Sequence, residues 1–154
     1  MNYVTTVLCE LQQSLAHMIA GGVFERHPDL RLILLEADVG WIPHFIYRMD
    51  HFRPLGKRFK RSAMEIFQNN IYSTVQFEQS NLKWLTEYLG AEHFMWSTDY
   101  PHFDCPFPHS RKFVNDLFES FSPETAAMIL EGVPSRLFGF DPARLPEPQL
   151  GPPA

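Results

Sequence analysis

The sequence predicts an α/β domain in which helices and strands alternate around a parallel sheet. Short apolar runs typical of buried strands occur at 30–37, 70–77 and 94–98, and segments with helical spacing separate them. Strands that alternate with helices form βαβ units, whose strands run parallel. Hydrophobic residues make up 45% of the 154 residues. A chain of this length and composition can bury one sizeable core, so we expect a single domain.

The first predicted helix, over 4–20, has leucines and other apolar residues at helical spacing and ends at a pair of glycines. The strand at 30–37 is rich in branched residues, as expected of a strand covered on both faces. A second helix over 41–52 follows, with Pro43 in its first turn, where proline is tolerated. The basic segment 53–61 is interpreted as a solvated loop, with an anion-binding patch as the alternative.

The second half of the chain repeats this alternation. Ser62 and Glu65 have the spacing of a capping box and predict the start of a short helix. The elements expected after it are a strand at 70–77, a helix at 80–90, a strand at 94–98, and helices at 111–121 and 123–131. Five prolines in the last fourteen residues predict a disordered tail over 141–154, so the folded domain should span 1–140.

Composition and charge argue against several classes of function. With 13 Lys and Arg against 18 Asp and Glu, the net charge is −5, whereas a general nucleic-acid binder would carry a basic stripe. The chain lacks a run of about 18 apolar residues, so no membrane span is expected, and its N-terminus lacks the pattern of a signal peptide. Two cysteines, Cys9 and Cys105, are too few for a disulfide scaffold, which favours a cytoplasmic protein.

Polar side chains gather where each predicted strand ends. In parallel sheets, active sites lie just beyond the C-terminal ends of the strands. That rule selects a few residues after each strand, which are Glu36 and Asp38, Gln76 and Glu78, and Asp99 with His102 and Asp104. Three successive strand ends that offer acids and a histidine make a candidate site.

Asp99 is the leading candidate, because a carboxylate at a strand end can bind a divalent metal or accept a proton. The alternative is that Asp99 caps the turn that follows it. Glu36 ends an apolar strand, where a buried and unpaired carboxylate is costly, so it should either meet a cation or cap the next helix. His102, three residues after Asp99, could contribute to the same site or be structural.

Eight short motifs are distributed along the chain: GGVFERHPDLRL (21–32), LEA (35–37), GWIP (40–43), RMD (48–50), NIY (70–72), STDYPH (97–102), LEG (130–132) and RLFG (136–139). Together they resemble the amidohydrolase-related family of metal-dependent hydrolases, whose members include resorcylate-type and aminocarboxymuconate-semialdehyde decarboxylases. Each motif is weak alone, and the combination is fairly specific. The resemblance covers about residues 17–140.

The resemblance implies a (β/α)8 TIM barrel with a catalytic divalent metal, most commonly zinc, at the C-terminal face of the strands. It implies that Asp99 is the aspartate of the eighth strand, which binds the metal or handles a proton. Glu36 falls where decarboxylase relatives often carry a histidine, and it is assigned with His102 to contacts around the metal or with the substrate. The implied activity is hydrolysis or decarboxylation of a small carboxylate or amide-type substrate. The aromatic residues that could line its pocket or pack in the barrel wall are Trp41, Trp96 and Phe103.

The sequence lacks the His-x-His metal motif of that family, and it supplies about three strands where a barrel needs eight strands and about 250 residues. We therefore expect the C-terminal part of a barrel, inactive by itself. Open sheet edges predict a homo-oligomer or pairing with a missing N-terminal barrel part. The alternatives are a non-catalytic α/β binding or interaction module, and a degenerate barrel subunit completed by dimerisation.

Overall fold

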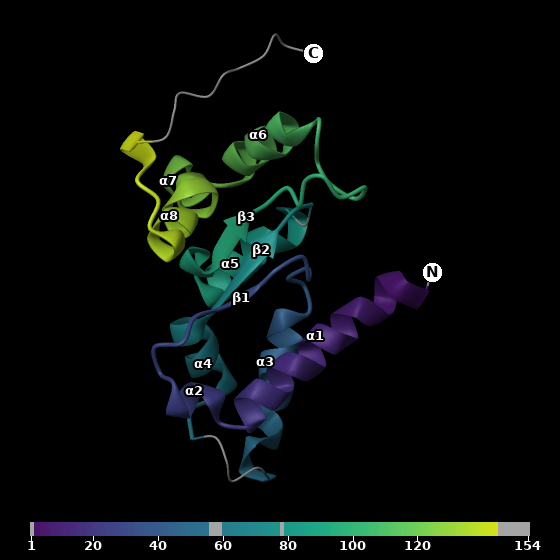
Figure 1. The fold of residues 1–154 in the computed structure, drawn as a ribbon, viewed down its shortest axis with the longest axis vertical. Helices are drawn as coiled ribbons and strands as arrows, with labels where there is room; N and C mark the ends of the chain where they lie inside the picture. Colours follow the sequence, from purple (N-terminus) through teal and green to yellow (C-terminus); the bar gives the residue numbers. More distant parts are fainter. Residues whose placement is uncertain (1, 56–59, 78, 145–154) are drawn as a thin grey trace.

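Residues 2–55, 60–77 and 79–144 are described by the computed structural model, which confirms the predicted alternation of helices and strands (Figure 1). The main elements, in chain order, are α1 (Asn2–Ala20), α2 (Val23–Arg26), β1 (Leu32–Leu34), α3 (Ile42–Phe52), α4 (Ala63–Asn70), β2 (Ile71–Val75), α5 (Gln79–Leu89), β3 (Phe94–Trp96), α6 (Ser110–Ser120), α7 (Pro123–Ala127) and α8 (Val133–Phe138). Within the described residues, none of the helices has the length and apolar character needed to cross a membrane.

The three strands form one parallel sheet with β2 in the centre. Leu32 lies opposite Ile71 in the first pair, and Ser73 lies opposite Phe94 in the second. Among the described residues, β1 and β3 pair with no strand except β2, so both edges of this sheet are open. The structure is therefore an open parallel α/β sheet, as expected for a part of a barrel that has not closed.

The first strand is shorter than the sequence predicts. The apolar run continues through Leu35, but only Leu32–Leu34 pairs with β2. Glu36 has a φ of 51° and Asp38 a φ of 48°, in the left-handed region that residues other than glycine rarely adopt. The backbone thus turns out of the sheet at Glu36, and the preceding Leu35 side chain is left 62% exposed.

One buried apolar core joins the strands to the helices packed against them. Figure 1 shows α1 to α4 gathered at one end of the molecule and α6 to α8 at the other, with the strands between them. The fully buried members with the largest side chains include Phe24, Phe67, Phe94, Ile19, Ile42, Ile71, Leu82, Leu85, Leu117 and Ile129. These side chains come from the strands and from helices at both ends of the molecule. The core therefore holds the strand ends in a fixed arrangement.

The start of α4 confirms the predicted capping box. Ser62 Oγ accepts a hydrogen bond from the backbone N–H of Glu65 at 3.0 Å, and the Ser62 N–H donates to Glu65 Oε2 at 2.6 Å. The bond from the Ser62 N–H is the largest cause that lowers the pKa of the Glu65 carboxyl, and the Ser62 hydroxyl is the second. Asp50 near the end of α3 accepts a further bond from the Ala63 N–H at 2.6 Å. The cap therefore ties α4 to α3 as well as starting the helix.

The C-terminal helices run further than expected. The predicted helix over 123–131 consists of α7 and a π-helical turn at Met128–Gly132, and α8 follows without a break. The helix continues because Gly132 keeps helical dihedral angles, with φ −64°, and because Pro134 lies in the first turn of α8, where proline is tolerated. Of the predicted tail, Pro142–Arg144 forms a 3-10 turn, and residues 145–154 lie outside the described residues.

Candidate functional site

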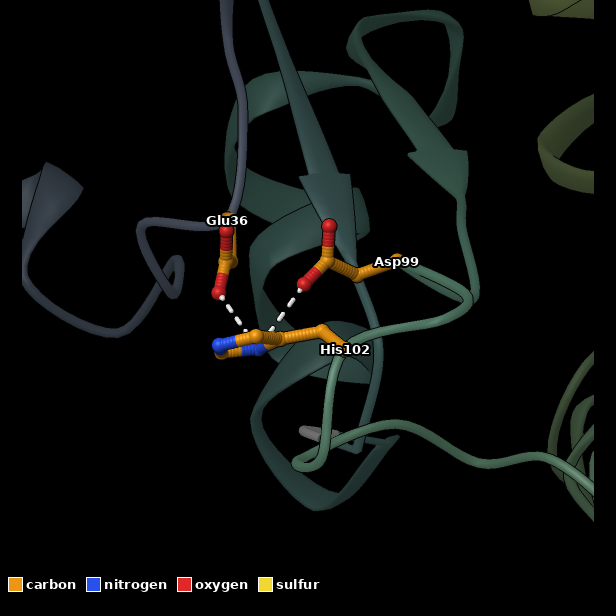
Figure 2. Close-up of side chains that lie close together, drawn as sticks. All are labelled: Glu36, Asp99 and His102. Atoms are coloured by element: carbon orange, nitrogen blue, oxygen red, sulfur yellow. Dashed lines mark ion pairs between the residues drawn. The ribbon is translucent and has the colours of Figure 1, made fainter.

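Three residues selected from the strand ends meet in space. Nδ1 of His102 lies 3.1 Å from Oδ2 of Asp99 and 3.4 Å from Oε1 of Glu36 (Figure 2). Glu36 follows β1, whereas Asp99 and His102 follow β3, so the central strand β2 separates the two contributing loops. In the part of the chain that the structure describes, this is the one group of three His, Cys, Asp or Glu side chains whose ligand atoms lie within 4.8 Å of one another.

Both acids of this cluster have backbone dihedral angles that are costly for their residue types. Asp99 has a φ of 53° and Glu36 a φ of 51°. Left-handed geometry at residues other than glycine costs of order 1–3 kcal/mol each and concentrates at functional sites. The Glu36 N–H donates to Thr74 Oγ1 at 3.1 Å, and the Asp99 carbonyl accepts from the His102 N–H at 2.9 Å. These two bonds hold the acids in place against the strain.

Two tryptophans hold the loops that follow the strands. The Trp41 indole Nε1 donates to the Ala37 carbonyl at 2.7 Å, and the Trp96 indole Nε1 donates to the Gln76 carbonyl at 3.3 Å. Each indole therefore fixes the backbone next to the cluster. Phe103 differs from them, because its side chain is 93% exposed and borders a pocket. Of the three aromatic candidates, Phe103 alone is among the residues that line the pocket.

The neighbours of Glu36 alter the pKa of its carboxyl group. Partial removal from water, followed by the negative charge of Asp99, raises the pKa of the Glu36 carboxyl above its ordinary value, and His102 opposes this rise. The Glu36 side chain is 50% exposed and that of Asp99 is 32% exposed, so the cluster opens to solvent on one side. Two carboxylates with one imidazole between them leave a site that favours a cation.

The donor atoms fit a divalent metal. Two carboxylate oxygens and one imidazole nitrogen form a mixed N and O set, which suits Mn²⁺ and Zn²⁺ better than a soft metal that prefers sulfur. Asp99 and His102 lie on one loop and Glu36 on another, so an ion bound by all three would link β1 to β3. The described residues supply three ligand atoms at that place, which leaves further positions on an ion for other groups.

The remaining predicted residues have different surroundings. Asp38, Gln76 and Asp104 lie outside the three-residue cluster but line a pocket of about 190 Å³ beside it, together with Glu36 and His102. Glu78 lies outside the described residues. The same pocket is also lined by residues that the strand-end rule did not select, which are Leu8, Ala37, Thr74, Phe77 and Phe103. Thr74 carries no signal in the sequence, because its role depends on the contact between β1 and β2.

Comparison with known proteins identifies the family of the chain. The amidohydrolase family model matches residues 9–140, so the chain belongs to that family. The chain is 34% identical over 91 residues to the gamma-resorcylate decarboxylase of Rhodococcus jostii (strain RHA1). That match covers 54% of this chain and 27% of the relative. The chain therefore spans much less than two thirds of the length of this curated relative.

Solved structures share the fold. An amidohydrolase from Mycobacterium avium subsp. paratuberculosis K-10 superposes with a TM-score of 0.78 and 22% identity, over 92% of this chain and 36% of that one. A dihydroxybenzoic acid decarboxylase from Polaromonas sp. JS666, solved with bound manganese and the inhibitor 2-nitroresorcinol, gives a TM-score of 0.69 and 23% identity. The latter match covers 86% of this chain and 40% of that one.

Proposed function

We propose that this chain supplies the C-terminal part of a metal-dependent enzyme that decarboxylates a small aromatic carboxylate. The observation that carries the proposal is the convergence of Glu36, Asp99 and His102 at the C-terminal ends of parallel strands. Curated relatives that are gamma-resorcylate decarboxylases favour cleavage of a carbon–carbon bond over amide hydrolysis. In such a reaction the bond to the carboxylate breaks, CO2 leaves, and a proton is added to the ring carbon.

Asp99 and His102 would hold the divalent metal, with Glu36 as a third contact or as a neighbour of the bound substrate. When bound, the ion supplies Lewis-acid polarisation of a carboxylate or carbonyl group. Manganese in the Polaromonas relative supports a divalent ion, and zinc is our first expectation for this chain. The donor set accommodates either.

The residues of this chain would orient the substrate and handle its proton. Asp99 is fixed by the turn to His102, so its carboxylate presents a constant geometry to a substrate. Glu36 lies 3.4 Å from the same imidazole, which allows a proton to be held at Glu36 Oε1 or at His102 Nδ1. Phe77 and Phe103 border the adjoining pocket and would exclude water from one side of a planar ring.

The proposal is tested in a chimera, in which a relative provides the rest of the barrel. In the Rhodococcus jostii enzyme, the C-terminal segment that corresponds to the family-model match is replaced by residues 9–140 of this chain, and CO2 release from gamma-resorcylate is measured with Zn²⁺ or Mn²⁺. We expect metal-dependent release that Asp99→Asn abolishes and that Asp116→Asn, a control on α6, preserves. The unmodified 154-residue chain alone should release no CO2. A chimera that unfolds cooperatively yet releases none with either ion would contradict the proposal.

The open edges of the sheet are also compatible with two alternatives. A degenerate barrel completed by a second copy would place two Asp99 clusters in one assembly, and a non-catalytic module would use the same surface for binding. Both alternatives predict that the chain is stable without any other barrel part. Amide exchange that protects β1, β2 and β3 in the isolated chain would favour them, whereas rapid exchange in β1 and β3 favours the proposal.

A further inference from the structure

A pocket of about 190 Å³ adjoins the Glu36–Asp99–His102 cluster. Pockets for drug-sized ligands are roughly 300–1,000 Å³, so this space fits a compound of about one ring. Its apolar walls come from Leu8, Phe77 and Phe103. These come from α1 and from the loops that follow β2 and β3, so three separate parts of the chain form one concave surface.

Gln76 brings a buried side-chain donor without a partner among the described residues to the lining of this pocket. It follows β2, the central strand, and its carbonyl is held by the Trp96 indole at 3.3 Å. Its side-chain nitrogen Nε2 is buried and has no hydrogen-bond partner among the described residues. A buried N–H group without a partner is costly, and such groups are rare in native proteins. Gln76 is one of the residues that line the pocket, and its anchored backbone holds the side chain at that place.

The charges nearby determine what this donor can bind. Glu36, Asp38 and Asp104 also line the pocket, and each brings a carboxylate. An additional negative charge would be repelled there unless a cation offset it. The Thr74 hydroxyl already donates its hydrogen to the Leu34 carbonyl at 3.5 Å and accepts one from the Glu36 N–H. The Gln76 amide is therefore the uncharged donor best placed for an uncharged acceptor oxygen.

We propose that Gln76 Nε2 donates a hydrogen bond to a hydroxyl or carbonyl oxygen on a single-ring ligand, whose ring contacts Phe77 and Phe103. Gln76 is then a specificity-determining residue, because a ring without that oxygen leaves the buried donor unpaired. This inference rests on the proposed function, since it assigns to that site substrates with an uncharged oxygen substituent on the ring. The carboxylate that reacts would occupy the neighbouring cluster.

The experiment uses the full chain and two neutral probes. Acetophenone has a carbonyl oxygen that only accepts hydrogen bonds, and indole has an N–H that only donates. The side-chain NH2 resonances of Gln76, assigned by their loss in Gln76→Leu, are followed by NMR during each titration. We expect acetophenone to shift them saturably and indole to leave them in place. This comparison in the wild-type chain decides the proposal even if a variant fails to fold.

Variants extend the test. Gln76→Leu should weaken acetophenone binding about fivefold, the value of one neutral hydrogen bond. Gln76→Glu, which can only accept, should weaken acetophenone at least as much and strengthen indole. Gln68→Leu and Gln68→Glu, made at an exposed site on α4, are the matched controls and should change neither. Equal acetophenone binding by wild type and Gln76→Leu, or a preference of the wild type for indole, would overturn the proposal.

The two proposals fail separately. If the chimera releases no CO2 but acetophenone still shifts the Gln76 resonances, the pocket recognises the oxygen and the reaction class is wrong. If the chimera is active while Gln76→Leu leaves acetophenone binding unchanged, the decarboxylase proposal stands and the role of Gln76 is refuted.

Discussion

The His102 Nδ1 atom lies 3.1 Å from Asp99 Oδ2, three residues earlier in the chain. A short turn closes this distance, because the His102 N–H donates to the Asp99 carbonyl at 2.9 Å. The imidazole and the carboxylate therefore approach each other through local backbone structure, and their pairing does not depend on the opposite side of a barrel. Glu36 joins them only through the pairing of β1 with β2 and of β2 with β3.

Replacing Asp99 by Asn should weaken divalent metal binding to the chain. The amide keeps the shape of the side chain but removes the negative charge that attracts the cation. Replacing even an outer partner of a metal ligand typically costs 10–100-fold in affinity, so we expect at least about a tenfold loss for Mn²⁺ in titration calorimetry. Asp116→Asn removes a carboxylate that pairs with Lys112 on α6, and it should leave Mn²⁺ affinity unchanged. Equal losses in both variants would show that the ion binds diffusely.

The order of elements could be predicted because it depends on local pattern. Short apolar runs separated by segments with helical spacing indicate all three strands, and the rule that sites follow strand ends selects Glu36, Asp99 and His102. The structure brings these three side chains together. The Ser62 capping box was also predictable, since both partners lie within one turn. What these features share is that neighbours in the sequence determine them.

Other features depend on contacts between distant segments. The early end of β1 reflects the left-handed backbone at Glu36, which the Thr74 hydroxyl supports from 38 residues away. Leu8 reaches the pocket from α1, and nothing in its own segment indicates this. In the sequence, Phe103 cannot be told from an aromatic residue that packs in the core, yet its side chain is exposed. Such placements follow from tertiary packing, which overrides local propensity.

Asn70 should be essential to stability, because its fully buried amide connects three segments. Its Nδ2 donates to the carbonyls of Pro28 and Leu30, each at 2.7 Å, and its Oδ1 accepts from the Arg61 guanidinium at 2.9 Å. Asn70→Asp would replace the donor with an oxygen that faces two carbonyls. We expect the free energy of unfolding in urea to fall by about 3 kcal/mol.

The neighbouring Asn69 provides the control for that prediction. Its side chain is exposed and donates one hydrogen bond, to the Glu65 carbonyl. Asn69→Asp makes the same chemical change on the solvent side of α4 and should cost no more than about 0.5 kcal/mol. A similar loss in the two variants would mean that added charge, and not the buried hydrogen bonds, determines the effect.

Stability should decrease at mildly acidic pH because of His93. The side chain is 4% exposed, its Nδ1 lies 3.0 Å from the Ile71 carbonyl, and its ring lies near those of Phe67 and Tyr72. Burial is the largest cause that lowers the pKa of His93 below its ordinary value of 6.5, and the charge of Arg136 adds to it, whereas the Ile71 carbonyl and Glu92 oppose it. The unfolded chain therefore binds the proton more readily than the folded one.

The sign of the pH effect follows from that difference. Above pH 6.5 His93 is mostly neutral in both states, and its contribution to stability is complete. As the pH falls below 6.5, protonation favours the unfolded chain, and the free energy of unfolding should decrease. The decrease should be smaller in His93→Asn, which keeps a donor for Ile71, while His27→Asn at an exposed site should retain the wild-type slope. A slope unaffected by His93→Asn would assign the pH dependence to the carboxylates.

Self-association should occur through the β1 edge. Among the described residues, β1 pairs with a strand on one side only, and its open edge lies beside Leu35, which is 62% exposed. Such edges recruit other strands. Light scattering should give a mass above the 17.9 kDa monomer, and Leu35→Glu should lower it, because a charge at an edge opposes strand pairing. Trp84→Glu adds the same charge to the exposed face of α5, where the side chain is 53% exposed, and it should leave the mass unchanged. A wild-type chain that is monomeric and unfolds cooperatively would show that three strands suffice for a stable domain.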